Sequence, residues 1–366
     1  KYLTMNKLLI ENNAKRRYDV DWLRVLALGL LIVYHAVVAF QSWGHKIFFI
    51  QNKEFLELLW LPMSMFNIWR IPILFMISGM GVYFAMRRRN WKQLLKDRTL
   101  RILLPFVFGF FFICPINIYI ASIFYGKDLF YIPNPGHLWF LGNIFIYVLA
   151  MLPMLIYLNN RPDNFIFRYL SRIFRFPLGV VFLALLPMTE SFLVRPEYFT
   201  TYAMTPHGFW LGLICFFIGF CIVSLGGVFW DAVEKARLFM LSTAFLLFLV
   251  RLVIFLKTQV EGRHALTGFE SMCWMLAVLG YGSMYLNKPS HTLFYCKEAV
   301  YPIYIVHMPL QLFFSLYIIP LSIPAIIKLV LLLASTFGGS LIIYEVLRRL
   351  KWLRPLFGMK PVTVSE

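Results

Sequence analysis

Arg24 and His35 enclose one apolar stretch of the chain, "RVLALGLLIVYH", in which ten residues with almost no polarity separate a guanidinium from an imidazole. On an α-helix this spacing is about three full turns and a rise of roughly 16 Å, so both side chains lie on one face. Ionisable groups inside an apolar helix are costly and usually functional. A neutral imidazole acts as a general base near neutral pH. Asp21, one turn before Arg24, either pairs with Arg24 or caps the helix.

The composition is that of an integral membrane protein. Of the 366 residues, 60% are hydrophobic and only 14% are charged, and the mean hydropathy is +0.73. Soluble domains have about 25% charged residues. The net charge of +18 does not indicate a nucleic-acid partner, because the Lys and Arg residues gather in the loops of one side of the predicted membrane topology.

Long apolar runs predict an all-α, polytopic membrane protein with about ten transmembrane helices. The positive-inside rule then places both termini in the cytoplasm. We predict a cytoplasmic N-terminal segment (1–21), a single membrane domain (22–350) and a cytoplasmic C-terminal tail (351–366). The ten predicted spans are roughly 22–42, 58–86, 102–124, 138–158, 174–193, 208–228, 238–256, 266–286, 298–319 and 323–347.

Both ionisable residues of the first predicted span also have structural interpretations. Arg24, at the cytoplasmic end, has a stem long enough to reach the lipid headgroups with its charge. His35, near the middle of the bilayer, has ring nitrogens that can hydrogen-bond a neighbouring helix. The sequence alone leaves these interpretations open beside the catalytic one.

Six stretches of the chain, in the same order, resemble motifs of the membrane acyltransferase 3 family. The branch that resembles this chain most is the one containing the periplasmic glucan succinyltransferases, on the strength of "HLWFL" and the ending "FGMKP". The six stretches are "DWLRVLALGLLIVYH", "WRIPILFMISGMG", "DRTLRILLPF", "HLWFL", "YPIYIVHMPL" and "YEVLRRLKWLRPLFGMKP".

The resemblance implies an acyl-CoA-dependent O-acyltransferase of the bacterial inner membrane. Such an enzyme transfers an acyl group, acetyl or succinyl, from cytoplasmic acyl-CoA to a hydroxyl of an extracytoplasmic glycan. Acyl-CoA is then a co-substrate, with no bound cofactor and no metal. The partners implied are the glycan acceptor, the lipid bilayer and, for the last step, either this domain alone or a separate periplasmic protein.

Cytoplasmic arginines are the candidates for binding the phosphates of acyl-CoA, because guanidinium groups bind phosphate oxygens in pairs. Arg98 and Arg101 match the family pattern at the start of the third span, and we favour function for them. For the neighbouring cluster, positive-inside topology explains the charges equally well. That cluster consists of Arg87, Arg88 and Arg89.

His35 is the predicted general base, supported by Arg24 and Asp21, and the oxyanion formed on the thioester carbonyl needs hydrogen-bond donors. Arg70, Ser78 and Trp139 are candidates. For Ser78 we favour a packing or hydrogen-bonding role over that of a nucleophile, and for Arg70, whether inside the membrane or at its outer rim, we expect a partner.

Four further residues have open roles. His137 either contacts the acceptor or begins a hydrated helix end, and His307, one turn from Tyr304, serves either catalysis or a core hydrogen bond. Glu345 on the final span is expected to pair with an arginine. The main alternative to an enzyme is a multi-span transporter or flippase for a glycan or lipid-linked substrate, although no paired repeat with broken helices is evident.

Overall fold

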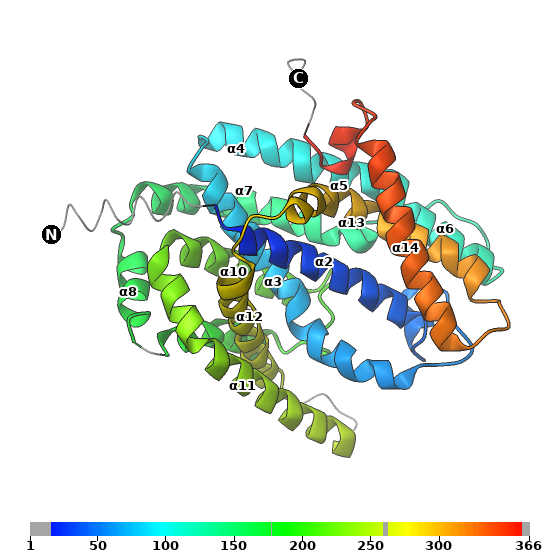
Figure 1. The fold of residues 1–366 in the computed structure, drawn as a ribbon, viewed down its shortest axis with the longest axis horizontal. Coiled ribbons are helices and arrows are strands. Elements are labelled where there is room, and N and C mark those ends of the chain that lie inside the picture. Colours follow the sequence, from blue (N-terminus) through cyan, green and yellow to red (C-terminus); the bar gives the residue numbers. More distant parts are fainter. Residues whose placement is uncertain (1–15, 177, 259–262, 361–366) are drawn as a thin grey trace. The chain divides into compact units, whose positions relative to one another are not determined.

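The computed structural model describes residues 16–176, 178–258 and 263–360. Most of the predicted N-terminal segment and the end of the predicted tail therefore lie outside the described residues. The described chain is 79% helical and contains no strand, which confirms the all-α prediction (Figure 1). Its apolar sequence explains this, because a helix satisfies its own backbone hydrogen bonds where water is scarce.

Eight helical stretches among the described residues are long and apolar enough to cross a membrane. Their positions agree with eight of the ten predicted spans. The other two predicted spans coincide with α12 (His264–Leu286) and with the shorter apolar stretch Gly179–Val194. The number ten therefore stays a prediction. The eight stretches are Tyr18–Val38, Glu57–Met86, Trp91–Phe124, Gly136–Asn160, Pro206–Ser224, Gly227–Thr258, His291–Ile318 and Ala325–Leu347.

The helices along the chain begin and end as follows. They are α2 (Tyr18–Val38), α3 (Trp60–Met86), α4 (Trp91–Arg98), α5 (Leu104–Phe108), α6 (Cys114–Phe124), α7 (Trp139–Asn160), α8 (Phe165–Ile173), α9 (Leu185–Val194), α10 (Pro206–Ser224), α11 (Gly227–Thr258), α12 (His264–Leu286), α13 (His291–Ile318) and α14 (Ala325–Leu347). The break between α13 and α14 falls at "IIPLSIPAI", between the last two predicted spans.

Backbone contacts divide the chain into two compact units. The described residues of unit 1 fall within Lys1–Arg24, Met65–Leu94 and Ile146–Leu293, and those of unit 2 within Val25–Ser64, Leu95–Phe145 and Phe294–Glu366. No change of composition in the sequence marks this division of the predicted single membrane domain. Helix α2 passes from one unit to the other after Arg24.

Within unit 1, α3 and α10 cross at two glycines. A Cβ atom on Gly79 would lie 1.9 Å from the carbonyl oxygen of Phe216, and one on Gly219 would lie 1.9 Å from that of Met76. Small residues allow such close backbone approach between apolar helices. Gly79, the first glycine of the stretch "ISGMG", is therefore a packing residue.

We predict that Gly219→Ala lowers the free energy of unfolding by about 1–3 kcal/mol, since the new methyl group must push the helices apart. Thermal unfolding of the detergent-solubilised protein measures this. Gly29→Ala on α2 is the control, because no atom lies within 4 Å of a Cβ placed there. Equal loss of stability in both variants would contradict the close crossing.

Proline inside α3 shapes the same unit. Pro72 has no N–H to donate to the carbonyl oxygen of Ile68, one turn earlier in the helix. Two hydroxyls replace the missing donor, with Tyr202 Oη at 3.0 Å and Ser271 Oγ at 2.7 Å from that oxygen. The proline thus creates an acceptor through which α3 is joined to α12 and to the segment before α10.

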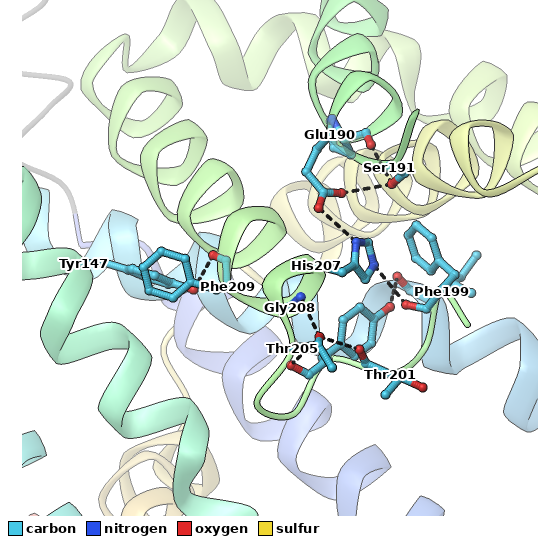
Figure 2. Close-up of polar contacts among 12 residues, drawn as sticks. Tyr147, Glu190, Ser191, Phe199, Thr201, Thr205, His207, Gly208 and Phe209 are labelled. Atoms are coloured by element: carbon cyan, nitrogen blue, oxygen red, sulfur yellow. Dashed lines mark hydrogen bonds and ion pairs between the residues drawn. The ribbon is translucent and has the colours of Figure 1, made fainter. Parts of the chain in front are cut away.

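Buried charged and polar side chains connect the remaining helices of unit 1. His207 Nδ1 lies 2.9 Å from Glu190 Oε1, and its Nε2 donates to the carbonyl oxygen of Phe199 at 3.0 Å (Figure 2). Arg251 of α11 pairs with Glu270 of α12, with 2.8 Å between Nε and Oε2. Pairing is what makes buried charge tolerable, so both pairs are structural contacts.

In unit 2 the third apolar stretch contains two π-helical turns, Thr99–Leu103 and Gly109–Ile113. A π turn interrupts the regular backbone bonding and exposes carbonyl groups. At the second turn, the carbonyl oxygen of Phe111 accepts a bond of 2.8 Å from Tyr131 Oη. A Cβ on Gly109 would lie 2.0 Å from Leu138 Cδ1. The π turn and the glycine together allow the segment before α7 to pack against this third apolar stretch.

Candidate active site

A hydrogen bond to α13 holds the ring of His137, and a proline in α13 leaves the acceptor carbonyl free for it. Pro309 has no N–H to offer the carbonyl oxygen of Ile305. The Nε2 atom of His137 lies 3.1 Å from that oxygen and donates to it, while Asn117 Nδ2 lies 3.4 Å from Nδ1. Tyr304 Oη donates in turn to the backbone carbonyl of His137. Both ring nitrogens of His137 therefore have protein partners, which gives this side chain a structural contact.

A double-mutant cycle tests this contact. We expect His137→Phe to lower the free energy of unfolding by about 1–3 kcal/mol, because it leaves the carbonyl of Ile305 without a hydrogen-bond donor. In the Pro309→Ala background the new N–H can reach that carbonyl, so the same substitution should cost less. Unfolding free energies of the four proteins give the coupling. Additive effects would mean that His137 stabilises the protein in some other way.

His35 and His307 face one another within unit 2. His35 Nδ1 of α2 lies 3.0 Å from His307 Nε2 of α13. The rings are parallel, with centroids 5.3 Å apart. His307 is fully buried, whereas His35 is partly exposed and also contacts the ring of Phe49. Two histidines that were separate candidates in the sequence thus form one pair.

The neighbouring carbonyl determines where the protons of this pair lie. His307 Nδ1 is 2.7 Å from the carbonyl oxygen of Tyr304. A carbonyl only accepts, so Nδ1 of His307 carries the proton, and in the neutral ring Nε2 has the lone pair. His35 Nδ1 must then donate to it. The Nε2 atom of neutral His35 is left unprotonated, which is the form that a general base requires.

Asp21 and Arg24 lie together in unit 1. The distance between Arg24 Nη1 and Asp21 Oδ1 is 3.7 Å, and Asp21 Oδ2 also accepts from Arg16 Nη2 at 3.0 Å. The predicted pairing of Asp21 with Arg24 is confirmed. The capping alternative is wrong, because α2 begins at Tyr18 and Asp21 lies inside it. Helix α2 carries both Arg24 and His35 along its length, as predicted.

The arginines predicted to bind the donor divide between the two units. Arg98 ends α4, and Arg101 lies in the first π turn, both in unit 2. Arg101 Nε is 3.4 Å from the carbonyl oxygen of Gly358 in the C-terminal segment, so its two terminal nitrogens remain for another ligand. Unit 1 contains the other three, Arg87, Arg88 and Arg89, of which the first two are exposed.

The candidate oxyanion donors also divide between the units. Arg70 and Ser78 are in unit 1, where Arg70 Nη2 donates to Asn67 Oδ1 at 2.8 Å, so Arg70 has a partner, as expected. Ser78 Oγ donates to the carbonyl of Leu74 in its own helix at 2.8 Å, as a packing residue would. Trp139 is buried at the start of α7 in unit 2.

Glu345 pairs with an arginine, as predicted. Its Oε2 lies 2.9 Å from Arg348 Nε, and its Oε1 accepts from Tyr295 Oη at 2.8 Å. The bond from Tyr295 joins α13 to the end of α14. These are the contacts of a structural residue.

Several buried polar residues were missed by the sequence analysis. Glu190, His207, Arg251 and Glu270 form the two pairs of unit 1, and Gln311 lies in α13 one turn after His307. Arg251 and Gln311 are lone polar residues in apolar runs, a signal that could have been read as for His35. Among the described residues, no three His, Cys, Asp or Glu side chains are grouped as a metal site requires.

The described residues contain eight helices long and apolar enough to cross a membrane, and a histidine pair lies within unit 2. The family model for the acyltransferase domain, acyltransferase 3, matches residues 17–345. The chain belongs to this family and is a membrane acyltransferase.

The chain is similar to curated proteins named glucans biosynthesis protein C. Those of Salmonella schwarzengrund (strain CVM19633), Salmonella paratyphi B and Salmonella heidelberg are each 37% identical to this chain over 94 residues. The matched segment covers 25% of this chain and 24% of the relative, about a quarter of each. No solved structure matches the chain.

Proposed function

We propose that this protein is an acyl-CoA-dependent O-acyltransferase that uses His35 as its general base. The observation that carries the proposal is the chain of contacts from the carbonyl of Tyr304 through His307 to His35, which leaves Nε2 of His35 unprotonated. In a family of acyltransferases, a positioned base in an apolar helix suits the activation of a hydroxyl.

The proposed reaction transfers one acyl group and one proton. The acceptor hydroxyl gives its proton to Nε2 of His35 while its oxygen bonds to the thioester carbonyl carbon. The resulting oxyanion collapses, the carbon–sulfur bond breaks, and the proton passes from His35 to the departing thiolate. The products are an O-acyl ester and free CoA thiol. His307 keeps its lone pair toward His35 throughout and stabilises the transient imidazolium.

The donor is an acetyl or succinyl thioester of CoA, and Arg98 and Arg101 bind its phosphates. Both arginines lie in the same unit as His35, and Arg101 retains donors for a bidentate contact. The acceptor is a glycan hydroxyl, in keeping with the names of the curated relatives. We place the protein in a bacterial inner membrane, with acyl-CoA on the cytoplasmic side and the acceptor on the other.

Arg98→Ala combined with Arg101→Ala is expected to weaken acyl-CoA binding by about tenfold or more, since each phosphate contact is a charge-assisted bond. Equilibrium binding to the purified protein measures this. The pair Arg168→Ala and Arg172→Ala on α8 removes the same charge from exposed positions and serves as the control. An unchanged dissociation constant for acyl-CoA would mean that Arg98 and Arg101 do not bind the donor and only contribute to the membrane topology.

The proposed function is tested by incubating the purified protein with radiolabelled acetyl-CoA or succinyl-CoA and a periplasmic glucan. An acyltransferase attaches the label to the glucan and releases free CoA thiol in equal amount. A transporter or flippase leaves both substrates chemically unchanged. Absence of transfer from any acyl-CoA, with glucan movement across vesicles, would favour the transporter alternative.

A further inference from the structure

Gln311 of α13 is a fully buried amide without a hydrogen-bond partner on its side chain. Its exposed fraction is 0%, and neither its nitrogen nor its oxygen is within bonding distance of a described protein group. Its backbone carbonyl, in contrast, accepts from Ser315 Oγ at 2.8 Å. Buried amides in native proteins are almost always hydrogen-bonded, so this side chain calls for a ligand.

Two hydroxyls of α14 share this property. Thr336 and Ser340 are both 0% exposed, and neither side-chain oxygen has a partner among the described residues. Ser335, the neighbour of Thr336, shows the usual alternative, because its Oγ donates to the carbonyl of Leu331 at 2.7 Å. A hydroxyl in an apolar helix normally satisfies itself in this way. Thr336 and Ser340 instead point their hydroxyls elsewhere.

The three side chains lie at one level of unit 2. A Cβ on Gly339 would be 3.0 Å from the ring of Phe314 and 3.7 Å from Leu310, so this part of α14 packs against residues 310–314 of α13. Gln311 is inside that stretch. Thr336 and Ser340 are one helical turn apart and flank Gly339, so all three polar residues are within about one turn of the contact.

The same face of α13 carries His307, one member of the histidine pair. His307 and Gln311 are one turn apart, which separates them by about 40° around the helix and about 6 Å along it. His307 contacts His35 through its ring. A group hydrogen-bonded by Gln311 would therefore lie about one helical turn from His307, the partner of the proposed base His35.

The chemistry of these residues identifies the class of ligand. An amide and two hydroxyls are neutral, and each can both donate and accept. Such groups match the hydroxyls of a sugar, whereas an anion such as the CoA phosphates would require a cation. We propose that Gln311, Thr336 and Ser340 bind hydroxyl groups of the acceptor and present one of them to His35. This inference rests on the proposed function, whose acceptor it assigns to these residues.

The test is to measure acceptor binding and turnover for Gln311→Met, Thr336→Val and Ser340→Ala, with Ser335→Ala as the matched control. Binding of unlabelled periplasmic glucan is measured directly, so that it does not depend on transfer. We expect Gln311→Met to weaken glucan binding and raise the acceptor KM by about tenfold or more, and each hydroxyl deletion by about two- to tenfold. Acyl-CoA binding by these variants stays at the wild-type level. Glucan binding and turnover by Ser335→Ala also stay at the wild-type level.

Stability separates a binding site from a structural one. Replacing an amide that has no partner by an apolar side chain of similar shape should leave the melting temperature unchanged or raise it. A lowered melting temperature with unchanged glucan binding would overturn the proposal and indicate structural water. Unchanged glucan binding in all three variants would overturn it as well. If no transfer occurs even in the wild type, but Gln311→Met still weakens glucan binding, the site stands and the proposed reaction fails.

Discussion

His35→Ala is expected to lower acyl transfer by about 10²–10⁴-fold, the usual contribution of a positioned general base. The neutral imidazole that accepts the hydroxyl proton is removed, while α2 keeps an excellent helix former at that position. The protein should still insert, purify and bind acyl-CoA, because Arg98 and Arg101 are untouched. Initial rates of label transfer from acyl-CoA to glucan measure the effect.

His45→Ala provides the matched control, since His45 is exposed in the short 3-10 turn after α2. Its transfer rate should equal that of the wild type. A wild-type rate in His35→Ala would remove His35 from the mechanism. A variant that does not fold is recognised by its melting curve, and His35→Gln, which keeps a polar side chain of similar length, then replaces it in the assay.

His307→Leu is expected to lower kcat by up to about the same factor as loss of the base, although His307 is not predicted to touch substrate. The lone pair of His307 Nε2 accepts the proton of His35 Nδ1, and the leucine removes this acceptor. The other tautomer then presents an N–H to the acceptor hydroxyl instead of a lone pair. The KM for acyl-CoA should not change.

His307→Gln separates this positioning role from packing. A glutamine carbonyl can accept from Nδ1 of His35 near the position of the lost Nε2, so we expect it to recover most of the activity that leucine loses. If glutamine and leucine are equally impaired in kcat and equally unstable, His307 has only a packing role. If both keep wild-type kcat, the tautomer of His35 is not set by His307.

Much of the helical framework follows from hydropathy alone. Each predicted span coincides with a helical stretch, and the break between α13 and α14 lies where Pro320 and Pro324 occur. The choice of His35 as a candidate also follows from the sequence, because an ionisable side chain in an apolar run is costly. Residue spacing along one helix is enough for inferences of this kind, including the pair of Asp21 with Arg24.

Contacts between distant parts of the chain could not be predicted in the same way. His35 and His307 are 272 positions apart, and no spacing rule connects them. The contact of His137 with Ile305 depends on a carbonyl that Pro309 leaves without a donor, and identifying its partner requires the fold. Gln311 gave no motif, because its significance lies in the absence of protein partners around a buried amide.

The most direct test of the central claim uses the protein in vesicles of known sidedness. Labelled acyl-CoA is supplied on the cytoplasmic face, and periplasmic glucan is enclosed on the other. We predict ester-linked label on the glucan in the wild type, with stoichiometric release of CoA thiol, and loss of this label in His35→Ala. Label transfer that persists at the wild-type rate in His35→Ala, or glucan that stays unlabelled in the wild type while acyl-CoA is bound and turned over elsewhere, would contradict it.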